Sequence, residues 1–508
     1  MTKEKNKIIL VIILILISLI ALVGSSYALL TKSFKSKKLS MEVGTLKIDF
    51  AEGNAINMAN AAPMTDSDGL KSTPYTFTIT NGGDINAYYT VSNEEELANT
   101  LDTSYLRMKL TGSDGYDSGI KTVKELGTET YKLIDDTLLE TGKSVTYELR
   151  MWISQDAGNN IQDKIYKSKI VVNGASNKLL LATDKILAKA NPEDLDYNSA
   201  TDVQKKEMWT FTHEATEQTT ALTDYRYIGA DPNNYVKFND ELWRIIGVFD
   251  TDDGTGKVEK RLKIIRNESI GDYSWDNKDT TTGAENDYGK NEWTDARLNY
   301  LLNPGHESET TGGSLYWNRG AGNCYYGQNN ATTACDFTTT GLTEEAKAMI
   351  GNAKWYLGGT ANYNNSSNGL ASHFYKYERG TSVYSGRSTS WTGKVGLMYP
   401  SDYGYATSGG ATTNRASCLV KELFNWADSS VSDCKNNDWM YNSSLWQWTI
   451  SPRAAAAYSD NVFDVFNTGY VDDNDANNAN AARPVVHLRS TIKVITGSGT
   501  KESPYILE

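Results

Sequence analysis

Histidine and cysteine are scarce in this chain, with four of each among 508 residues. The four His residues are scattered, and the sequence has no Cys-x-x-Cys pair and no His-Glu-x-x-His pattern, so the common zinc sites are not expected. The Gly-x-Ser-x-Gly elbow, the phosphate-binding loop and the dinucleotide fingerprint are missing as well. We therefore expect a protein that is not an enzyme and that has no metal site of familiar spacing.

Positive charge is also in deficit: 50 Lys and Arg stand against 63 Asp and Glu, for a net charge of −13. Such a surface repels phosphate backbones, which excludes nucleic acid as an expected partner. Proline is rare, with nine residues, whereas Tyr and Trp are abundant at 31 and 12. This composition favours aromatic-rich sheets with polar loops, and the length predicts two or three domains.

A long apolar run is present only near the N-terminus, where it extends from Ile8 to Val23 after a basic start. A basic start, an apolar core and small residues before a cut are the parts of a secretory signal, and Ser26 and Ala28 occupy the two small positions. Cleavage there would make Leu29 the first residue of the exported protein. There are two alternatives, a retained single-pass anchor and a buried core helix. An anchor is possible in length, because the apolar stretch counted to Leu30 is just long enough to span a bilayer.

The four cysteines fall into two close pairs, Cys324 with Cys335 and Cys418 with Cys434. In an exported chain an even number of cysteines favours disulfide bonds, and pairing of neighbours is the simplest of three connectivities. Free buried thiols are the alternative. We expect two disulfides, each worth about 3 kcal/mol in the chain-entropy model.

Residues 39–175 alternate between apolar and polar side chains over short segments separated by turn residues. In Tyr75–Thr80 the apolar side chains share one face and the threonines share the other, as in a half-buried strand. Val145–Ile153 and Ile165–Val172 continue the pattern, so a β-sandwich is expected after the N-terminal segment of residues 1–38.

This part of the chain resembles the TasA and camelysin-type proteins. Gly24–Ala28 is similar to the end of their signals, Val43–Leu46 to the start of their mature domain, and Pro74–Asn81 and Leu149–Ile153 to later strands. The resemblance implies a jelly-roll-like sandwich in a surface or biofilm-matrix protein of a Gram-positive-type bacterium, and self-assembly through this module. The proteolytic activity reported for camelysin has no supporting motif here.

Residues 176–224 are expected to form a helical connector, because residues 176–192 carry an apolar stripe that ends at Pro192. Residues 225–508 follow as an α+β domain. Its expected elements are a hairpin around Asn239–Asp240 and short helices over residues 293–302 and 343–350.

The second domain resembles uncharacterised extracellular domains of Firmicutes. Leu242–Gly247, Asn291–Asn303 and the closing Ala482–Leu488 carry the resemblance. The same order of segments is similar to C-type-lectin-like and formylglycine-generating-enzyme-like folds. The resemblance implies a lectin-like recognition domain, with an enzyme of the formylglycine-generating type as the alternative.

Aromatic side chains beside acidic ones are the best candidates for a binding site. We expect Tyr399, Tyr403 and Tyr405 on one exposed loop, close to a late acidic loop with Asp472, Asp473 and Asp475. Trp439, Tyr441, Trp446 and Trp448 form a second aromatic group, while Trp243, Trp293 and Trp448 are expected in the core. No cofactor is expected, calcium at the acidic loop being the alternative.

These observations predict an extracellular or cell-surface protein, exported across the plasma membrane, with a non-catalytic role in recognition or adhesion. Its expected partner is a glycan or a protein of the cell surface, and the membrane itself if the N-terminal segment is retained. The alternative interpretation is a soluble carbohydrate-binding protein.

The exported protein is expected to begin at Leu29, and the substitution Ala28→Arg to block its release, because signal cleavage requires small residues before the cut. Mass spectrometry of the N-terminus of the exported protein measures this. An intact Met1 N-terminus on cell-associated protein would instead establish a single-pass anchor.

Overall fold

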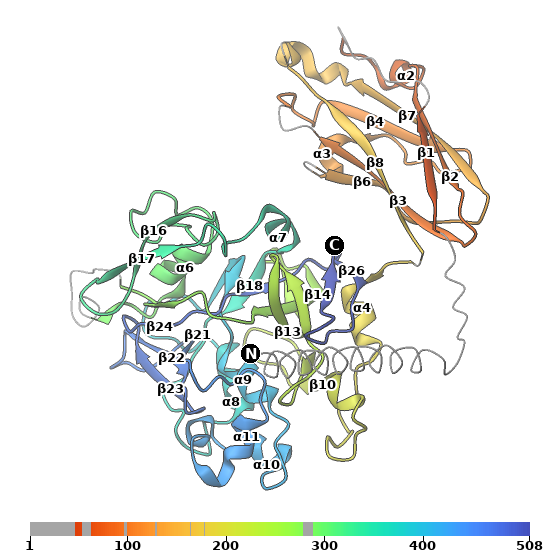
Figure 1. Ribbon diagram of the computed structural model, residues 1–508. Helices are drawn as coiled ribbons and strands as arrows, with labels where there is room; N and C mark the ends of the chain where they lie inside the picture. Colours follow the sequence, from red (N-terminus) through yellow and green to blue (C-terminus); the bar gives the residue numbers. More distant parts are fainter. Residues whose placement is uncertain are drawn as a thin grey trace, which may run out of the picture. The chain divides into compact units, whose positions relative to one another are not determined.

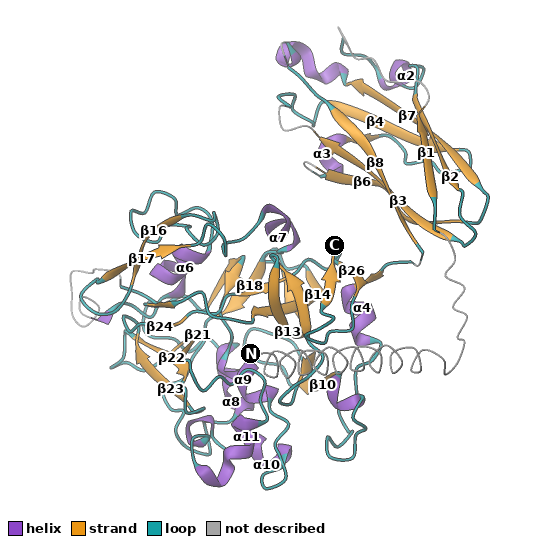
Figure 2. Cartoon of the chain, in the orientation of Figure 1, coloured by secondary structure: helices purple, strands orange, loops and turns teal. Residues whose placement is uncertain are grey.

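The computed structural model describes residues 46–52, 62–95, 99–127, 130–162, 164–176, 178–277 and 288–508. Strands predominate over helices, which confirms the expected mainly-β class (Figure 2). The chain divides into two compact units, Met1–Lys178 and Leu179–Glu508. Ser26, Ala28 and Leu29 lie outside the described residues. Within the described part of the chain, no helix has the length and apolar character needed to cross a membrane.

Unit 1 is a sandwich of two antiparallel sheets (Figure 1). One sheet has the order β1-β2-β7-β4-β5 and the other the order β6-β3-β8. The strands are β1 (Ile48–Glu52), β2 (Tyr75–Asn81), β3 (Ala87–Glu95), β4 (Leu106–Gly112), β5 (Lys121–Thr122), β6 (Thr130–Leu139), β7 (Ser144–Ile153) and β8 (Ser168–Ala175). The short helices are α2 (Asp66–Gly69), α3 (Val123–Leu126) and the 3-10 segment η1 (Gln155–Ile161).

The alternating pattern of β2 explains how the sandwich buries its core. Phe77 and Ile79 are fully buried, while Thr78 lies on the outer face and bonds Thr146 of β7 at 2.8 Å. Between the sheets, the hydroxyl groups of Tyr89 and Tyr147 form a buried hydrogen bond of 2.6 Å. The expected sandwich is therefore present, and paired tyrosines satisfy its buried polar groups.

Unit 2 is built on a ten-stranded sheet with the order β20-β25-β14-β13-β12-β27-β26-β9, to which β10 and β11 are added through β13. Its strands are β9 (Leu180–Leu181), β10 (Met208–His213), β11 (Leu222–Tyr227), β12 (Tyr235–Phe238), β13 (Glu241–Asp252), β14 (Val258–Arg266), β20 (Val395–Gly396), β25 (Val485–His487), β26 (Lys493–Thr496) and β27 (Tyr505–Leu507). Strands β12 and β13 form the expected hairpin, with φ of 57° at Asn239 and 59° at Asp240, the conformation of a tight two-residue turn.

Gly247 in β13 shows why the Leu242–Gly247 segment must end in glycine. A Cβ atom at this position would lie 2.2 Å from the carbonyl oxygen of Tyr225 in β11, which no side chain can tolerate. The glycine therefore lets β11 approach the central strand closely.

The expected helical connector of residues 176–224 is wrong in most of its length. Among the described residues of this range, only α4 (Ala182–Leu187) is an α-helix, and the segment η2 (Gln204–Lys206) is a single 3-10 turn. Strands β9, β10 and β11 belong to the ten-stranded sheet. The run Met208–His213 pairs with β11 over its whole length. Its threonines and aromatic residues favour a strand, and pairing across the sheet satisfies backbone groups that a polar linker would leave to water.

A second sheet of unit 2 has the order β15-β24-β21-β22-β23. Its strands are β15 (Asp272–Tyr273), β21 (Gln447–Pro452), β22 (Asn461–Val465), β23 (Val471–Asp475) and β24 (Asn480–Ala481). Two further antiparallel pairs form separate two-stranded sheets: β16 (Ala321–Tyr325) with β17 (Thr332–Asp336), and β18 (Ala353–Tyr356) with β19 (Ser390–Gly393). The remaining helices and 3-10 segments are η3 (Trp293–Asp295), α6 (Arg297–Leu302), α7 (Glu344–Met349), α8 (Ala371–Glu378), α9 (Pro400–Ala406), α10 (Arg415–Leu419), η4 (Leu423–Asn425), η5 (Ser429–Val431) and α11 (Ser432–Asn436). The two expected short helices thus appear as η3 with α6 and as α7. Trp243, Trp293 and Trp448 are buried, as expected.

Both disulfides form between neighbouring cysteines, as predicted. Cys324 and Cys335 join β16 to β17 with a Cα–Cα distance of 5.9 Å. Cys418 and Cys434 join α10 to α11 with a Cα–Cα distance of 5.4 Å. Each bond crosslinks two short elements of unit 2.

Replacing Cys418 and Cys434 with serine is expected to lower the free energy of unfolding of unit 2 by about 3 kcal/mol, because the unfolded chain regains the freedom that the closed loop removes. Urea denaturation of the full exported chain measures the change. The transition of unit 1, which contains no cysteine, is the internal control. An unchanged transition for unit 2 would contradict a stabilising role for this bond.

Candidate functional site

The expected tyrosine loop is wrong, because residues 400–406 form helix α9 and the three tyrosines are buried. Tyr399 is 3%, Tyr403 0% and Tyr405 8% exposed. Pro400 occupies the first turn of α9, where its missing N–H is not needed, and the side chain of Asp402 accepts the N–H of Tyr399 at 2.9 Å. This Pro-x-Asp start is the sequence signal that distinguishes the helix from a loop. The tyrosines are therefore not a ligand surface.

Each buried tyrosine has a structural contact. The hydroxyl oxygen of Tyr399 accepts the backbone N–H of Tyr356 at 2.8 Å. The hydroxyl group of Tyr403 donates to the carbonyl oxygen of Gly469 at 2.7 Å. The ring of Tyr405 packs edge-on against His213, with ring centroids 5.4 Å apart. Through Tyr403, α9 contacts the turn that precedes the acidic residues. The predicted tyrosine segment and the acidic segment are therefore close to each other, but the tyrosine lies in the core and not at the surface.

The acidic residues Asp472, Asp473 and Asp475 are half-buried on β23, the edge strand of the second sheet, and not on a loop. Arg453 donates to both carboxylate oxygens of Asp473, at 2.8 and 3.1 Å. The hydroxyl group of Tyr363 donates to the carboxylates of Asp472 and Asp473. Side chains of the protein therefore hold these two carboxylates in place.

Asp464 of β22 lies directly opposite Asp472 in the strand register and is fully buried. Its Oδ2 atom accepts hydrogen bonds from Asn474 at 3.0 Å and from Asn480 at 2.7 Å. Burial raises the pKa of Asp464 well above its usual value, and the negative charge of Asp472 adds to the shift although the hydrogen bond from Asn474 opposes it. The raised pKa favours the protonated form of Asp464, in which the repulsion between the two facing acids is smaller.

Within the described ranges, no group of three or more His, Cys, Asp or Glu side chains is arranged to hold a metal ion. Calcium at the acidic strand stays a prediction that these contacts do not test.

Four partly exposed aromatic side chains of unit 2 contact one another in a row, which we call the aromatic strip: Phe424 of η4, Trp446 just before β21, and Phe466 and Tyr470 on the turn between β22 and β23. Phe466 and Tyr470 stack across the turn with ring centroids 4.3 Å apart and an interplanar angle of 21°. Trp446, 44% exposed, packs on Phe466 at 4.9 Å, and Phe424 packs on Tyr470 at 5.9 Å. The strip is a continuous series of ring contacts at the surface of unit 2.

The turn that carries the strip is held by its own backbone and by three donors. Phe466 and Tyr470 close it through a backbone hydrogen bond of 2.9 Å, and Gly469 has a φ of 91°, which glycine adopts readily. Its three carbonyl oxygens, at residues 467, 468 and 469, accept hydrogen bonds from Tyr441, Lys435 and Tyr403 respectively. The position of the turn, and with it that of Phe466 and Tyr470, is thus set by contacts within the protein.

The aromatic strip adjoins the acidic strand. Tyr470 lies immediately before β23, and Asp472 is the second residue of that strand. Phe424 packs on Tyr363, with ring centroids 5.9 Å apart, and Tyr363 bonds Asp472. Flat apolar faces and a held carboxylate acceptor therefore lie in one region. Sequence reasoning named Trp446 but missed the strip; the signal was the Asn-Thr-Gly turn flanked by Phe466 and Tyr470.

A second feature that the sequence did not reveal is a buried network of charges between the ten-stranded sheet and α9. Arg226 of β11 donates to Asp224 and to Asp402, each at 2.9 Å, and Lys263 of β14 also donates to Asp402. All four side chains are at most 2% exposed. A ligand in solution cannot reach them, so the network serves the core and not recognition.

Glu378 is a further buried acid beside this network, at the end of α8. Its carboxylate accepts the backbone N–H of Ser401 at 2.9 Å and the hydroxyl group of Ser401 at 2.5 Å. Burial raises the pKa of Glu378 to about 7, although Arg379 and Ser401 oppose the shift. Glu378 is therefore a group of the core that titrates near neutral pH.

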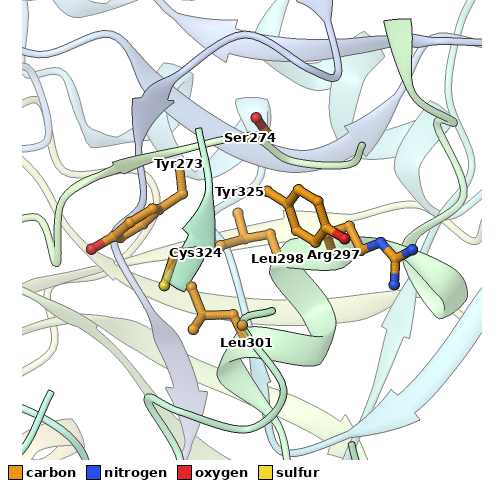
Figure 3. A pocket seen from close by; sticks show the side chains of 8 residues that line it. Tyr273, Ser274, Arg297, Leu298, Leu301, Cys324 and Tyr325 are labelled. Carbon is orange, nitrogen blue, oxygen red and sulfur yellow. The ribbon is translucent and has the colours of Figure 1, made fainter. Parts of the chain in front are cut away.

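The described part of the chain also contains a small pocket beside the disulfide of β16 and β17 (Figure 3). Its lining includes Tyr273, Ser274, Arg297, Cys324 and Tyr325. The space is sufficient for about one water molecule. It is too small to receive a sugar or a peptide.

The pKa of Glu378 predicts a measurable pH dependence. Because the folded state binds this proton more tightly than the unfolded state, the resulting stabilisation is complete below pH 4.5 and is lost as the pH rises to about 7. The substitution Glu378→Gln is expected to abolish this loss, which amounts to at most about 3 kcal/mol. Urea denaturation of both proteins at pH 5 and pH 7.5 measures the difference.

Glu259→Gln is the matched control. Hydrogen bonds from Lys257 and Arg261 lower the pKa of Glu259 to about 2, so this group does not titrate between the two pH values. Equal pH dependence of the wild type and of Glu378→Gln would show that Glu378 is already ionised at pH 5.

Comparison with known proteins adds little to this geometry. No protein-family model matches the chain, and no curated protein matches it. Among solved structures, the chain has a likeness to AvmM, which catalyses macrocyclization in alchivemycin A biosynthesis. The match has 10% sequence identity, covers 26% of this chain and 89% of that chain, and has a TM-score of 0.15. A TM-score this low supports no argument about fold or activity.

Proposed function

We propose that the chain is an exported surface protein with a non-catalytic recognition role, and that its second unit binds carbohydrate at the aromatic strip. The observation that carries the proposal is the row of ring contacts in which Trp446 packs on Phe466 and Phe466 stacks on Tyr470, on a turn that is held in place next to the strand of Asp472. Sugar rings present flat C–H faces and equatorial hydroxyl groups. Aromatic faces beside a carboxylate acceptor match both features.

The geometry favours an extended polysaccharide over a single sugar. The strip lies along an open surface, and the pocket beside Cys324 is too small for a sugar ring. Contacts spread along a row of rings suit a chain of several sugar units, each with a small share of the binding energy. Because the turn is already held by hydrogen bonds from Tyr403 and Tyr441, little conformational freedom is lost on binding.

The location of the protein is part of the same proposal. Two disulfides in unit 2 are compatible with an extracellular environment. The N-terminal residues have the composition of an export signal. Self-association through the sandwich of unit 1, which the resemblance to TasA and camelysin-type proteins implies, would anchor the recognition unit in a surface layer.

The substitution Trp446→Ala is expected to weaken polysaccharide binding by more than about tenfold, since truncation of an aromatic anchor typically costs about 2 kcal/mol or more. Binding of the full exported chain to an array of bacterial cell-surface polysaccharides measures the effect. Tyr326→Ala is the matched control, because Tyr326 is 45% exposed, close to the 44% of Trp446, and lies outside the strip. Equal binding by the two variants, or binding of the wild type to no polysaccharide, would contradict the proposal.

A further inference from the structure

Lys263 and Asp402 are a buried pair that joins distant parts of the sequence. Lys263 lies on β14 and Asp402 on α9, 139 positions apart in the sequence. The Nζ atom donates directly to Oδ2 of the carboxylate, and the side chains are only 2% and 1% exposed. The amine nitrogen therefore contacts an oxygen atom that is bonded to the carboxyl carbon, Cγ.

Aromatic rings surround the amine of Lys263. Its Nζ atom lies 4.3 Å from the ring centroid of Tyr399, 5.4 Å from that of Phe249 and 5.7 Å from that of Trp355. Such walls keep water from the pair, and burial lowers the pKa of Lys263. A lysine with a lowered pKa is more readily converted to the neutral amine, which is the nucleophilic form.

The opposite oxygen of Asp402 is bound by Arg226, whose Nη1 donates to Oδ1 at 2.9 Å. A second guanidinium nitrogen of Arg226 is held by Asp224, so the group has a set orientation. The positive charge draws electrons from Cγ and would stabilise negative charge that develops on Oδ1 during attack by an amine. Tyr399 N–H donates to Oδ2 at 2.9 Å.

The geometry points to an intramolecular isopeptide bond between Lys263 and Asp402. The side chains start as an ammonium and a carboxylate, since Lys263 and Arg226 outweigh the effect of burial and hold the pKa of Asp402 below its usual range. A proton moves from Nζ to Oδ2, the Nζ–Cγ bond forms, and the Cγ–Oδ2 bond breaks. Oδ2 leaves as water with two of the three ammonium protons, and the third remains on the amide nitrogen. The step needs no oxidant, metal or co-reactant.

Proximity explains how this condensation proceeds without activation by another reagent. Two groups held in contact by a folded protein react with an effective molarity of about 10⁵–10⁸ M, and a dry site opposes the reverse hydrolysis. Lys260 and Asp250 are the internal contrast: they form an ion pair of 3.1 Å between β14 and β13, but their side chains are 40% and 24% exposed. Water reaches that pair, so it stays ionic.

The consequence for the protein is a covalent link between the ten-stranded sheet and α9. Because Tyr403 of α9 bonds the turn that carries the aromatic strip, the link supports that surface from beneath. Its existence does not depend on what the strip binds, so the failure of one proposal leaves the other standing.

Intact mass spectrometry of the full exported chain, unfolded after purification, tests the inference. The expected mass is lower by one water molecule than the sequence mass corrected for two disulfides. Peptide mapping is expected to find one branched peptide that joins Lys263 to Asp402 and to find Lys260 and Asp250 in linear peptides. Lys263→Arg, which keeps the charge beside Asp402 but cannot form the amide, is expected to have the full mass and a lower midpoint of thermal unfolding.

Three results would overturn the inference. The first is a wild-type chain with the full sequence mass. The second is a loss of water that maps to residues other than Lys263 and Asp402. The third is a Lys263→Arg chain that shows the same loss. Lys260→Arg is the control for substitution on the same strand, and its mass is expected to show the loss of water as the wild type does.

Discussion

Asp402 receives hydrogen bonds from three directions, and the arrangement of unit 2 depends on them. Arg226 reaches it from β11, Lys263 from β14 and the backbone N–H of Tyr399 from the start of α9. An ionised carboxylate in a core without such partners would cost several kcal/mol, so the three donors and the acid require one another. The result is a helix of seven residues held in one position against the sheet, although a helix so short has little stability of its own.

The position of α9 is transmitted to the surface by one hydrogen bond. Tyr403 of the buried helix donates a hydrogen bond to the carbonyl oxygen of Gly469. The turn at Gly469 sets the relative position of Phe466 and Tyr470. The aromatic strip is thus held in position by the core to which its turn is bonded. This explains how partly exposed rings can have defined positions on a turn that has no helix or disulfide of its own, and it gives a buried tyrosine a role in a surface that it does not reach.

The two units solve the problem of buried polar groups in different ways. In unit 1, tyrosine hydroxyl groups bond each other between the sheets, as Tyr89 and Tyr147 do, and buried amides such as Asn81 and Asn93 bond a carbonyl oxygen and a tyrosine hydroxyl group. In unit 2, full charges are buried and paired. Buried ion pairs contribute little net stability compared with apolar packing, but loss of one partner is strongly destabilising. Unit 2 therefore gains a unique arrangement of its core from these pairs, at the risk that single substitutions disrupt it.

The sequence by itself determined features that depend on neighbouring residues. Alternation in Tyr75–Thr80 specified a strand, Asn239–Asp240 specified a hairpin turn, and two close pairs of cysteines gave two disulfides, because each follows from local backbone preference or from short loop closure. The tertiary structure alone decided the rest. Residues 208–213 became a strand because β11 was available for pairing, and Tyr399–Tyr405 became buried because Arg226 and Lys263, more than 130 residues away, bind Asp402. The aromatic strip combines residues from η4, from the position just before β21 and from the turn between β22 and β23. No local sequence pattern can show that rings so far apart in the sequence contact one another.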